Sequence, residues 1–295
     1  MMEKSYKNIV SIIPPPPFHM VGDGFRVHNF FPSLPETGLK GMSPFFLLDY
    51  GSKWNVPPSD VTKGVGVHPH RGFETVTIAY HGKVAHHDSA GNSGVIGEGD
   101  VQWMTAGAGI LHKEYHEKEF SKRGGLLQMV QLWVNLPAEY KMTAPKYQAI
   151  ENGNMGRFYS DDKKSFIEII AGEYNGIKGP AFTFSPVNLF NAKLKEGAKS
   201  EFTFNKEYNT GMVVIEGEIK INNSKTAPAD NFILFGHSGE DIVIEAAKDS
   251  IVLILSGEPI NEPIASYGPF VMNTEAEIKK AYEDFYNGNF GYLED

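Results

Sequence analysis

Cysteine is absent from the 295 residues of the sequence. A disulfide framework, a thiolate metal site and a cysteine nucleophile are therefore excluded. Any bound metal ion would have to be held by nitrogen and oxygen ligands from histidine and acidic side chains.

An excess of positive charge is also lacking. The chain has 27 lysine and arginine residues against 36 acidic ones, and its formal net charge is −9. A surface for direct binding of nucleic acid needs a basic patch or stripe, so this balance argues against that class of function. The charge balance does not exclude binding to a protein partner.

Long apolar runs are missing as well. No stretch of about 18 consecutive apolar residues occurs, so no ordinary membrane-spanning helix is expected. The N-terminal segment MMEKSYKNIVSIIPPPPF has neither the long apolar core nor the small-residue cleavage site of a secretory signal. We therefore expect a cytoplasmic protein without a membrane partner.

Glycine (31 residues) and proline (18 residues) separate short runs of β-type residues, a texture typical of a sandwich or barrel and not of βαβ units. The sequence predicts an all-β fold. The expected strands are 45–49, 74–80, 83–88, 100–105 and 126–135, followed by 182–184, 188–194, 200–204, 211–215, 218–221, 231–235, 242–245 and 250–255.

Length alone predicts about two domains. The polar segment 145–158, which contains Asn-Gly-Asn, is the expected boundary, giving an N-terminal domain 1–147 and a C-terminal domain 148–295. The segments IAYHGKV (78–84) and VIEGEIKI (214–221) both read as a strand, a glycine turn and a strand. This echo suggests two copies of one fold.

One helix is expected near the end of the chain, in TEAEIKKAYEDFYNG. Thr274 and Glu277 have the spacing of a capping box, apolar residues recur at helical spacing from Ile278 to Phe285, and Asn287-Gly288 is a stop signal. We expect its aromatic stripe to pack against one of the barrels.

The segment VHPHRGFETVTIAY (67–80) places two histidines among apolar residues. In one continuous strand, His68, His70 and Glu74 would share a face with Val76 and Ile78, because successive side chains point to opposite faces. Buried polar groups need partners, since an unpaired one costs roughly 2 to 7 kcal/mol. A metal ion is one such partner.

A second constellation lies in GAGILHKEYHE (107–117). If this segment is extended, His112 and Glu114, and with them His116, share a face, and Gly107 and Gly109 allow a sharp approach to the strand. Neighbouring strands about 5 Å apart can bring such side chains around one ion. Pattern alone leaves open whether Glu74 or Glu114 is the carboxylate ligand, and a lone inward histidine is more often a hydrogen-bonded core residue.

The remaining candidates are weaker. His81 lies in a glycine turn and His86-His87 flank Asp88, which favours surface or supporting roles, and His19 and His28 show no pairing signal. His237 alone lies in the second half. No G-x-S-x-G motif is present, and GAGIL is too short for a dinucleotide loop.

At this point the sequence resembles a pirin, a member of the bicupin branch of the cupin superfamily. The resemblance covers nearly the whole chain and is carried by HPHRGFETVT (68–77), GDVQWMTAGAGILHKE (99–114), QLWVNLP (131–137), IPPPPFHMVGDGF (13–25), SPFFLLDY (43–50) and EPIASYGPFVMNTEAEI (262–278). His87 stands where an acidic residue is frequent in the family, within AHHDS.

The resemblance implies two cupin-type β-barrels face to face, with one mononuclear metal in the N-terminal barrel and a degenerate, metal-free C-terminal barrel. It assigns His68, His70, His112 and Glu114 as ligands, which leaves Glu74 in a supporting role. Iron(II) is the first candidate, and Ni, Cu, Mn, Co and Zn also suit such ligands. Since the histidine ligands must be deprotonated to bind, we expect metal loss below about pH 6.

The resemblance implies two alternative functions. One is a quercetin 2,3-dioxygenase type of oxygenase, in which a flavonol reacts with dioxygen at the metal, Glu114 accepts the hydroxyl proton, and Val76, Ile78, Met104 and Ile110 are expected cavity walls. The other is an iron-dependent redox-sensing regulator that binds a protein partner.

Overall fold

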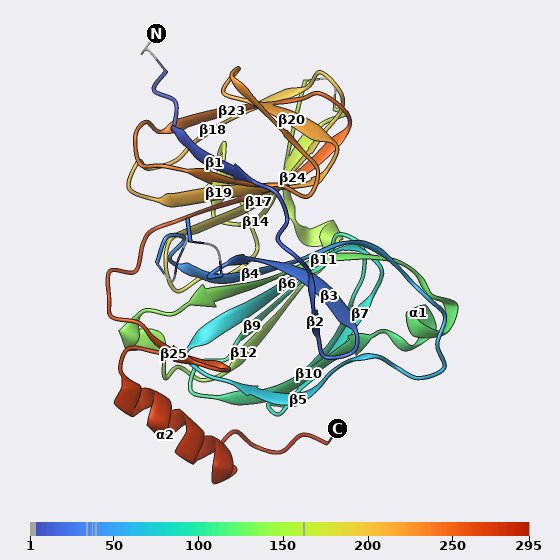
Figure 1. The fold of residues 1–295 in the computed structure, drawn as a ribbon, viewed down its shortest axis with the longest axis vertical. Helices are drawn as coiled ribbons and strands as arrows, with labels where there is room; N and C mark the ends of the chain where they lie inside the picture. The colour runs from blue at the N-terminus through green and yellow to red at the C-terminus, as the bar shows by residue number, and fades with distance from the viewer. Residues whose placement is uncertain (1–3, 34, 37, 39, 162, 295) are drawn as a thin grey trace. The chain divides into compact units, whose positions relative to one another are not determined.

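The computed structural model describes residues 4–33, 35–36, 38, 40–161 and 163–294. Antiparallel strands make up most of the fold, joined by turns and a few short helices (Figure 1). Two strand-rich units are present, and each contains a seven-stranded and a four-stranded sheet. The all-β, two-barrel fold expected from the sequence is confirmed. In the part of the chain so described, no helix is long and apolar enough to cross a bilayer.

The first barrel carries the histidine-rich segments, and its sheets have the orders β12-β9-β6-β11-β4-β3-β2 and β5-β10-β7-β8. The larger sheet consists of β2 (His19–Val21), β3 (Phe25–Phe31), β4 (Phe45–Val56), β6 (Phe73–His81), β9 (Val101–Thr105), β11 (Gly125–Asn135) and β12 (Lys146–Ile150). The smaller sheet consists of β5 (Gly64–His70), β7 (Val84–Asp88), β8 (Ser93–Ile96) and β10 (Ile110–His116).

The second barrel has the sheet orders β1-β22-β19-β24-β17-β14-β13 and β18-β23-β20-β21. The larger sheet consists of β1 (Ile9–Ile13), β13 (Gly156–Tyr159), β14 (Phe166–Ala171), β17 (Val187–Leu194), β19 (Asn209–Glu216), β22 (Phe232–Phe235) and β24 (Ser250–Gly257). The smaller sheet consists of β18 (Lys199–Thr203), β20 (Glu218–Ile221), β21 (Lys225–Pro228) and β23 (Asp241–Ala246).

Smaller elements complete the two units. They are the hairpins β15 (Glu173–Tyr174) with β16 (Ile177–Lys178) and β25 (Ala265–Tyr267) with β26 (Phe270–Met272), the helices α1 (Lys118–Arg123) and α2 (Glu275–Tyr286), and the 3-10 turns η1 (Ala138–Tyr140) and η2 (Asn152–Asn154).

The strand orders of the two barrels match position by position. Strands β4, β5, β6, β7 and β10 correspond to β17, β18, β19, β20 and β23, and β1 takes the place that β12 has in the first barrel. The two glycine-turn segments, 78–84 and 214–221, fall at the equivalent β6-β7 and β19-β20 connections. The expected internal duplication is therefore present.

The ends of the chain do not follow the expected division at 147/148. The first barrel comprises residues 17–31, 45–153 and 260–294, while the second comprises the described residues within 1–16, 32–44 and 154–259. The N-terminal strand β1 pairs with β22 of the second barrel, and helix α2 belongs to the first. The domain prediction is corrected at both ends, because a strand or helix joins the barrel that can pair with it, whatever its place in the sequence.

Twelve of the expected strands fall on observed ones, but residues 182–184 form no strand. Phe182 is more than half exposed, at 55%, and packs edge-on against Phe184 with ring centroids 5.1 Å apart. Pro180 and Pro186 flank the segment and cannot donate to a sheet ladder, so the aromatic residues stay in a loop.

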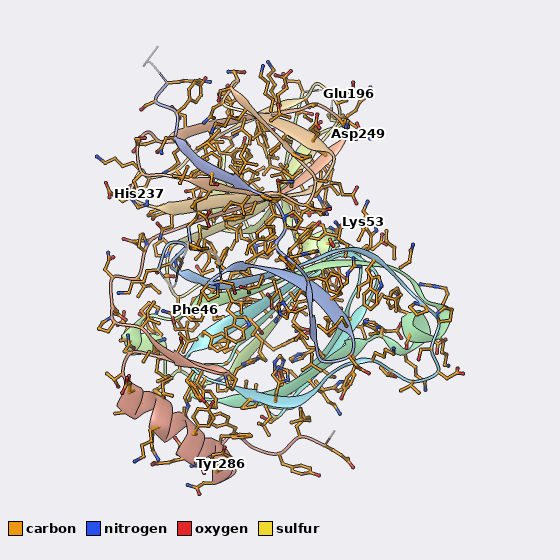
Figure 2. The ribbon with its side chains drawn as sticks, in the orientation of Figure 1. Phe46, Lys53, Glu196, His237, Asp249 and Tyr286 are labelled. Atoms are coloured by element: carbon orange, nitrogen blue, oxygen red, sulfur yellow. The ribbon has the colours of Figure 1, made fainter. Side chains whose placement is uncertain are left out.

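The expected C-terminal helix is confirmed as α2. Thr274 is its N-cap, and the reciprocal bonds of the capping box with Glu277 are both present. The apolar face, with Ile278 and Ala281, packs in one cluster with Phe270 and Phe290, beside the β25-β26 hairpin (Figure 1). Tyr286 points outward and is 78% exposed (Figure 2).

The core of the second barrel is apolar where the first barrel is polar. The strands β18 and β23, equivalent to β5 and β10, contribute Phe202, Ile242 and Ile244 to this core, and these side chains carry no ligand atoms. His237, labelled in Figure 2, lies after β22 with its Nε2 atom 3.0 Å from Asn209 Oδ1. A metal-free second barrel stays a prediction that these residues support.

Candidate metal centre

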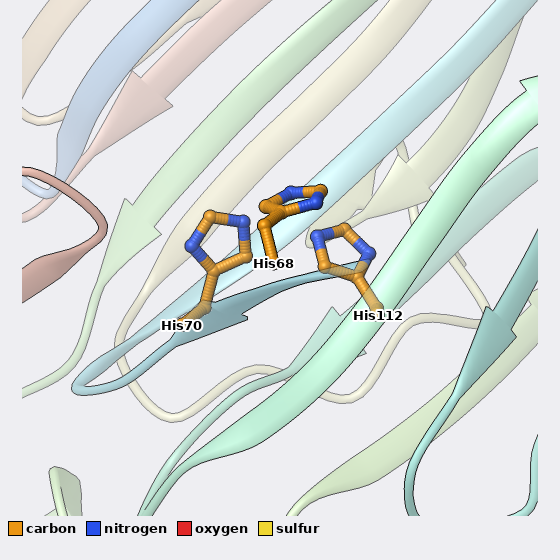
Figure 3. Close-up of side chains that lie close together, drawn as sticks. All are labelled: His68, His70 and His112. Atoms are coloured by element: carbon orange, nitrogen blue, oxygen red, sulfur yellow. The ribbon is translucent and has the colours of Figure 1, made fainter. Parts of the chain in front are cut away.

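Three imidazole rings converge inside the first barrel (Figure 3). His68 and His70 come from β5 and His112 from the neighbouring β10, where His112 pairs directly with His68. The ring centroids of the three pairs lie 4.2, 4.7 and 4.8 Å apart, and one nitrogen atom of each ring lies within 4.8 Å of the others. The H-x-H pattern and the cross-strand register thus create the cluster.

The hydrogen bonds of the rings fit a metal ion. His68 Nδ1 lies 2.8 Å from the Gly66 carbonyl and His70 Nδ1 lies 3.3 Å from the Pro269 carbonyl, so Nε2 of each ring is left for coordination. His112 has no exposed surface, and neither of its ring nitrogens has a hydrogen-bond partner. Buried polar atoms are seldom left unsatisfied, and metal-bound histidines commonly donate their second nitrogen to a carbonyl.

The protonation state of the rings also suits a metal. Burial lowers the pKa of His68, and it lowers the pKa of His70 and His112 well below the ordinary value of 6.5. The neighbouring imidazoles add to the effect for His70 and His112, because each cation would disfavour the next. At neutral pH the rings are therefore uncharged, which is the form that binds metal.

Glu114 lies close to this cluster but on the side of His86. The carboxylate of Glu114 forms a second cluster with His112 and His86, and the ligand atoms of these three residues lie within 4.8 Å of one another. Glu114 Oε1 accepts a hydrogen bond of 3.1 Å from Gln102 and lies 3.1 Å from the Thr77 hydroxyl. The full set of His68, His70, His112 and Glu114 as ligands to one ion stays a prediction.

His86 is a polar residue whose position the sequence did not reveal. It is fully buried, its Nε2 lies 3.2 Å from Asp88, and its ring stacks on Tyr147. His87 points the other way and is exposed. The alternation within AHHDS could have separated the two, because β7 lies next to β10 and one face of it must turn inward.

Glu74 does not lie on the face of the histidines. The chain reverses at Arg71-Gly72, where Gly72 has φ of +87°, and β6 is a separate strand in the other sheet. Because Thr77 of β6 faces Glu114, alternation turns Glu74 to the opposite face. There burial raises the pKa of Glu74 to about 7, and its Oε1 accepts a 2.7 Å bond from the Thr105 hydroxyl.

A cavity of about 180 Å³ adjoins the cluster. Its polar lining includes His68, His70 and Glu114, and its apolar walls are Val21, Phe25, Val27, Val65, Met129 and Trp133. The sequence-based choice of walls was wrong. Val76 and Ile78 share the face of Glu74, while Met104 and Ile110 pack in a separate cluster.

Three further histidines of the first barrel, His116, His81 and His28, have structural contacts. His116 Nε2 lies 2.7 Å from the Gly24 carbonyl, and its ring packs edge-on against Phe25. His81 pairs with Glu98 at 3.3 Å, and His28 Nε2 lies 3.0 Å from the Ser52 hydroxyl. His116 therefore continues the face of β10 without joining the cluster.

Arg71, next to His70, connects both ligand-bearing segments to the end of the chain. Its Nε donates a 2.6 Å bond to the Ala108 carbonyl, its Nη1 lies 2.9 Å from Asp284, and its guanidinium lies over the Phe290 ring. The hydrogen bonds from Arg71, Lys280 and Asn289 hold the pKa of Asp284 below its usual range, Lys280 contributing most. These contacts fix the turn that follows His70.

Fold and cluster together define a two-barrel cupin protein with a histidine-lined centre in its first barrel. The family model described as Pirin matches residues 24–134, and the model of the Pirin C-terminal cupin domain matches residues 189–291. The chain belongs to the pirin family, as the resemblance of its motifs indicated.

Similar proteins agree with this assignment. A Pseudomonas aeruginosa protein, named provisionally as a quercetin 2,3-dioxygenase, is 46% identical over 92% of this chain and 94% of its own. Pirin-like protein 2 of Arabidopsis thaliana is 36% identical over 92% of this chain and 82% of its own. The crystal structure of a quercetin 2,3-dioxygenase from Acinetobacter baumannii has 46% identity and a TM-score of 0.90, covering 98% of this chain and 99% of that chain.

Proposed function

We propose that the chain is an oxygenase of the quercetin 2,3-dioxygenase type, which acts on a flavonol-like substrate with dioxygen. The proposed ligands of one divalent metal are His68, His70, His112 and Glu114. The observation that carries the proposal is the His112 ring, buried without a partner for either nitrogen beside two uncharged imidazoles. The activity named for the A. baumannii relative supports the reaction type.

The bound metal supplies a Lewis acid and a template for the substrate oxygens and dioxygen. Iron(II) is the proposed ion, and Ni, Cu, Mn, Co and Zn are the alternatives for a site of nitrogen and oxygen donors.

The chain provides the shape and the proton acceptor. Phe25, Val27 and Met129 line the cavity and favour an apolar aromatic substrate while they exclude water. Glu114 lies in the same lining, and its carboxylate accepts the proton of the substrate hydroxyl. Gln102 and Thr77 hold that carboxylate through Oε1 and thereby orient it.

The test is the aerobic loss of flavonol absorbance by protein reconstituted with ferrous iron, measured with the His112→Ala variant and with His237→Ala as a matched control. We expect His112→Ala to bind less than about a tenth of the wild-type metal, since losing one ligand weakens a site strongly. Turnover should fall in parallel. The His237→Ala variant should keep its metal content and its turnover, because His237 lies in the second barrel.

Metal stoichiometry and turnover distinguish the remaining outcomes. Equal metal content in His112→Ala and wild type would contradict the proposed ligand set. Bound iron without oxygen-dependent loss of flavonol would contradict the activity, and it would instead favour the regulatory alternative with a protein partner.

A further inference from the structure

A row of five polar side chains crosses the larger sheet of the first barrel, on the face that lines the cavity. Each member pairs directly with the next across neighbouring strands, in the order Asn29, Asp49, Gln131, Thr77 and Gln102. Direct cross-strand partners lie on the same face of a sheet. The row therefore faces the interior of the barrel, where Thr77 and Gln102 reach Glu114.

The row is interrupted between two of its members. Asn29 Nδ2 donates to Asp49 Oδ1 at 2.7 Å. The Thr77 hydroxyl lies 2.7 Å from Gln131 Oε1. Between the described side chains of Asp49 and Gln131, which are direct neighbours, no hydrogen bond is formed. Both of these side chains line the cavity, so the interruption faces its interior.

Asp49 and Gln131 keep hydrogen-bonding capacity that the protein does not use. An ionised carboxylate can accept about four hydrogen bonds, and among the described residues Asn29 alone donates to the carboxylate of Asp49. Gln131 has two donors on Nε2, whereas the atom next to Thr77 is Oε1. Buried polar groups without partners cost free energy, so a ligand that supplies these partners is favoured.

The charge of Asp49 restricts the chemistry of such a ligand. Asp49 is only 8% exposed, and burial raises the pKa of its carboxyl, although the hydrogen bond from Asn29 and the charge of His19 lower it. Within the described chain no lysine or arginine forms an ion pair with Asp49. A ligand hydroxyl that donates to the carboxylate would stabilise its ionised form, whereas an anionic group would be repelled.

The position of Asp49 also restricts the size of the ligand. Asp49 is two strands away from Thr77, so their backbones lie about 10 Å apart, and Thr77 contacts the proposed metal ligand Glu114. Met129 and Trp133, two residues before and after Gln131, form apolar walls of the cavity on either side of the row. This spacing favours a molecule of more than one ring, with polar groups at both ends.

We propose that Asp49, together with the Gln131 amide, makes this cavity specific for molecules that carry a hydroxyl group remote from their metal-binding oxygens. The remote hydroxyl donates to Asp49 and accepts from Gln131 Nε2. The inference rests on the function proposed above, since it names the substrate group that the same cavity recognises. Asp49 acts in recognition and not in the reaction.

The test compares two flavonols that share the metal-binding hydroxyl group. Quercetin carries further hydroxyl groups, whereas 3-hydroxyflavone carries none. Dissociation constants for both are measured without oxygen, so that turnover cannot interfere, on iron(II)-loaded wild type, Asp49→Asn and Asp60→Asn. Asparagine keeps the shape of Asp49 and an oxygen for Asn29, and the exposed Asp60 of the same barrel is the matched control. Metal content and circular dichroism report the state of each variant.

We expect the preference for quercetin over 3-hydroxyflavone, taken as the ratio of the two dissociation constants, to fall about tenfold in Asp49→Asn. Asp60→Asn should keep the wild-type ratio. Gln131→Met should lower the ratio as well, and it serves if Asp49→Asn does not fold. An unchanged ratio in the folded variant, or a wild type that does not prefer quercetin, would overturn the proposal.

Aerobic turnover of both flavonols, recorded in parallel, separates this proposal from the dioxygenase activity. A preference that depends on Asp49, without oxygen-dependent loss of either flavonol, would support the recognition role and contradict the activity alone. Turnover of both flavonols with the same preference in wild type and Asp49→Asn would support the activity and overturn the role of Asp49.

Discussion

Burial determines the protonation of the three clustered histidines. Their pKa values lie below 6.5 in the folded chain, so the unfolded chain binds more protons once the pH falls below that value. The contribution of these three histidines to the stability of the metal-free protein is therefore fully present above pH 6.5 and is lost on acidification. Burial also makes it harder for protons to displace a bound metal from these rings. We therefore expect the metal to be released at a lower pH than the value of about 6 expected for ordinary histidines.

We accordingly predict that the bound metal is retained at pH 6 and released only on further acidification. Equilibrium dialysis between pH 4 and 7, followed by measurement of the metal content, checks this. Full occupancy at pH 4, or loss already at pH 6.5, would contradict the role assigned to the buried imidazoles.

Burial of Glu74 makes stability depend on pH in the opposite direction to that of the histidines. Its pKa rises from 4.5 in the unfolded chain to about 7 in the folded one, so stability present below pH 4.5 declines as the pH rises to 7. A difference of this size corresponds to about 3 kcal/mol. Glu74→Gln, whose amide oxygen can still accept the bond from Thr105, should remove that decline and leave metal binding unchanged.

Urea unfolding of the wild type and of Glu74→Gln at pH 5 and pH 8 measures the effect as a difference between the two proteins. We expect the variant to gain stability relative to the wild type at pH 8 and to match it at pH 5. Parallel behaviour at both pH values would show that Glu74 is not the titrating group.

At the scale of elements, the turn between β5 and β6 decides which side chains face the histidine cluster. Lys141 Nζ donates to the carbonyls of Gly72 and Val271 at 2.9 and 2.8 Å, tying this turn to β26. Burial lowers the pKa of Lys141 to about 7, although its ammonium group has three hydrogen-bond acceptors, Asn135 being the third.

Gly72 and Gly91 form a natural pair of test positions, since their φ angles are +87° and +89°. A Cβ on Gly72 would overlap the Val271 carbonyl, whereas one on Gly91 would meet nothing within 4 Å. Gly91→Ala should cost about 1 kcal/mol for its backbone conformation alone. Gly72→Ala should cost about 1–3 kcal/mol more, as overpacking does, and lower the metal content.

Denaturant unfolding and metal analysis of the two variants separate backbone strain from steric contact. Equal losses of stability in both variants would mean that the contact between the turn and β26 contributes little to the free energy of unfolding. Wild-type metal content in Gly72→Ala would mean that metal binding does not depend on the turn that follows His70.

Alternation explains which parts of the centre could be predicted. Each of the two pairs, His68 with His70 and His112 with Glu114, lies within a single strand. Within one strand, alternation alone predicts that residues two apart share a face. Glu74 was assigned to the wrong face because the pattern was continued across Arg71-Gly72. That reversal depends on contacts with Ala108 and Asp284, which are distant in sequence and leave no local signal.

At the scale of the whole molecule, each barrel is completed by the opposite end of the chain. The sequence indicated two copies of one fold, but β1 and β12 occupy equivalent sheet positions and no local pattern tells which strand closes which barrel. Strand β1 pairs with β22, and the segment 260–294 supplies the Pro269 carbonyl to His70 and the Asp284 carboxylate to Arg71. Neither half of the sequence therefore contains all of its own barrel.

This arrangement predicts how the chain behaves when it is divided at 153/154. The fragment 1–153 lacks β26 and α2, so His70 loses its carbonyl partner and Arg71 its buried carboxylate, and we expect it to bind little metal. Co-expression with the fragment 154–295 should restore one equivalent, because each fragment then supplies the elements that the other's barrel needs. Metal content after co-purification measures the rescue, with the fragment 154–259 as the control that lacks the C-terminal segment. A fragment 1–153 that binds a full equivalent on its own would show that the C-terminal segment only covers the first barrel and does not position its ligands.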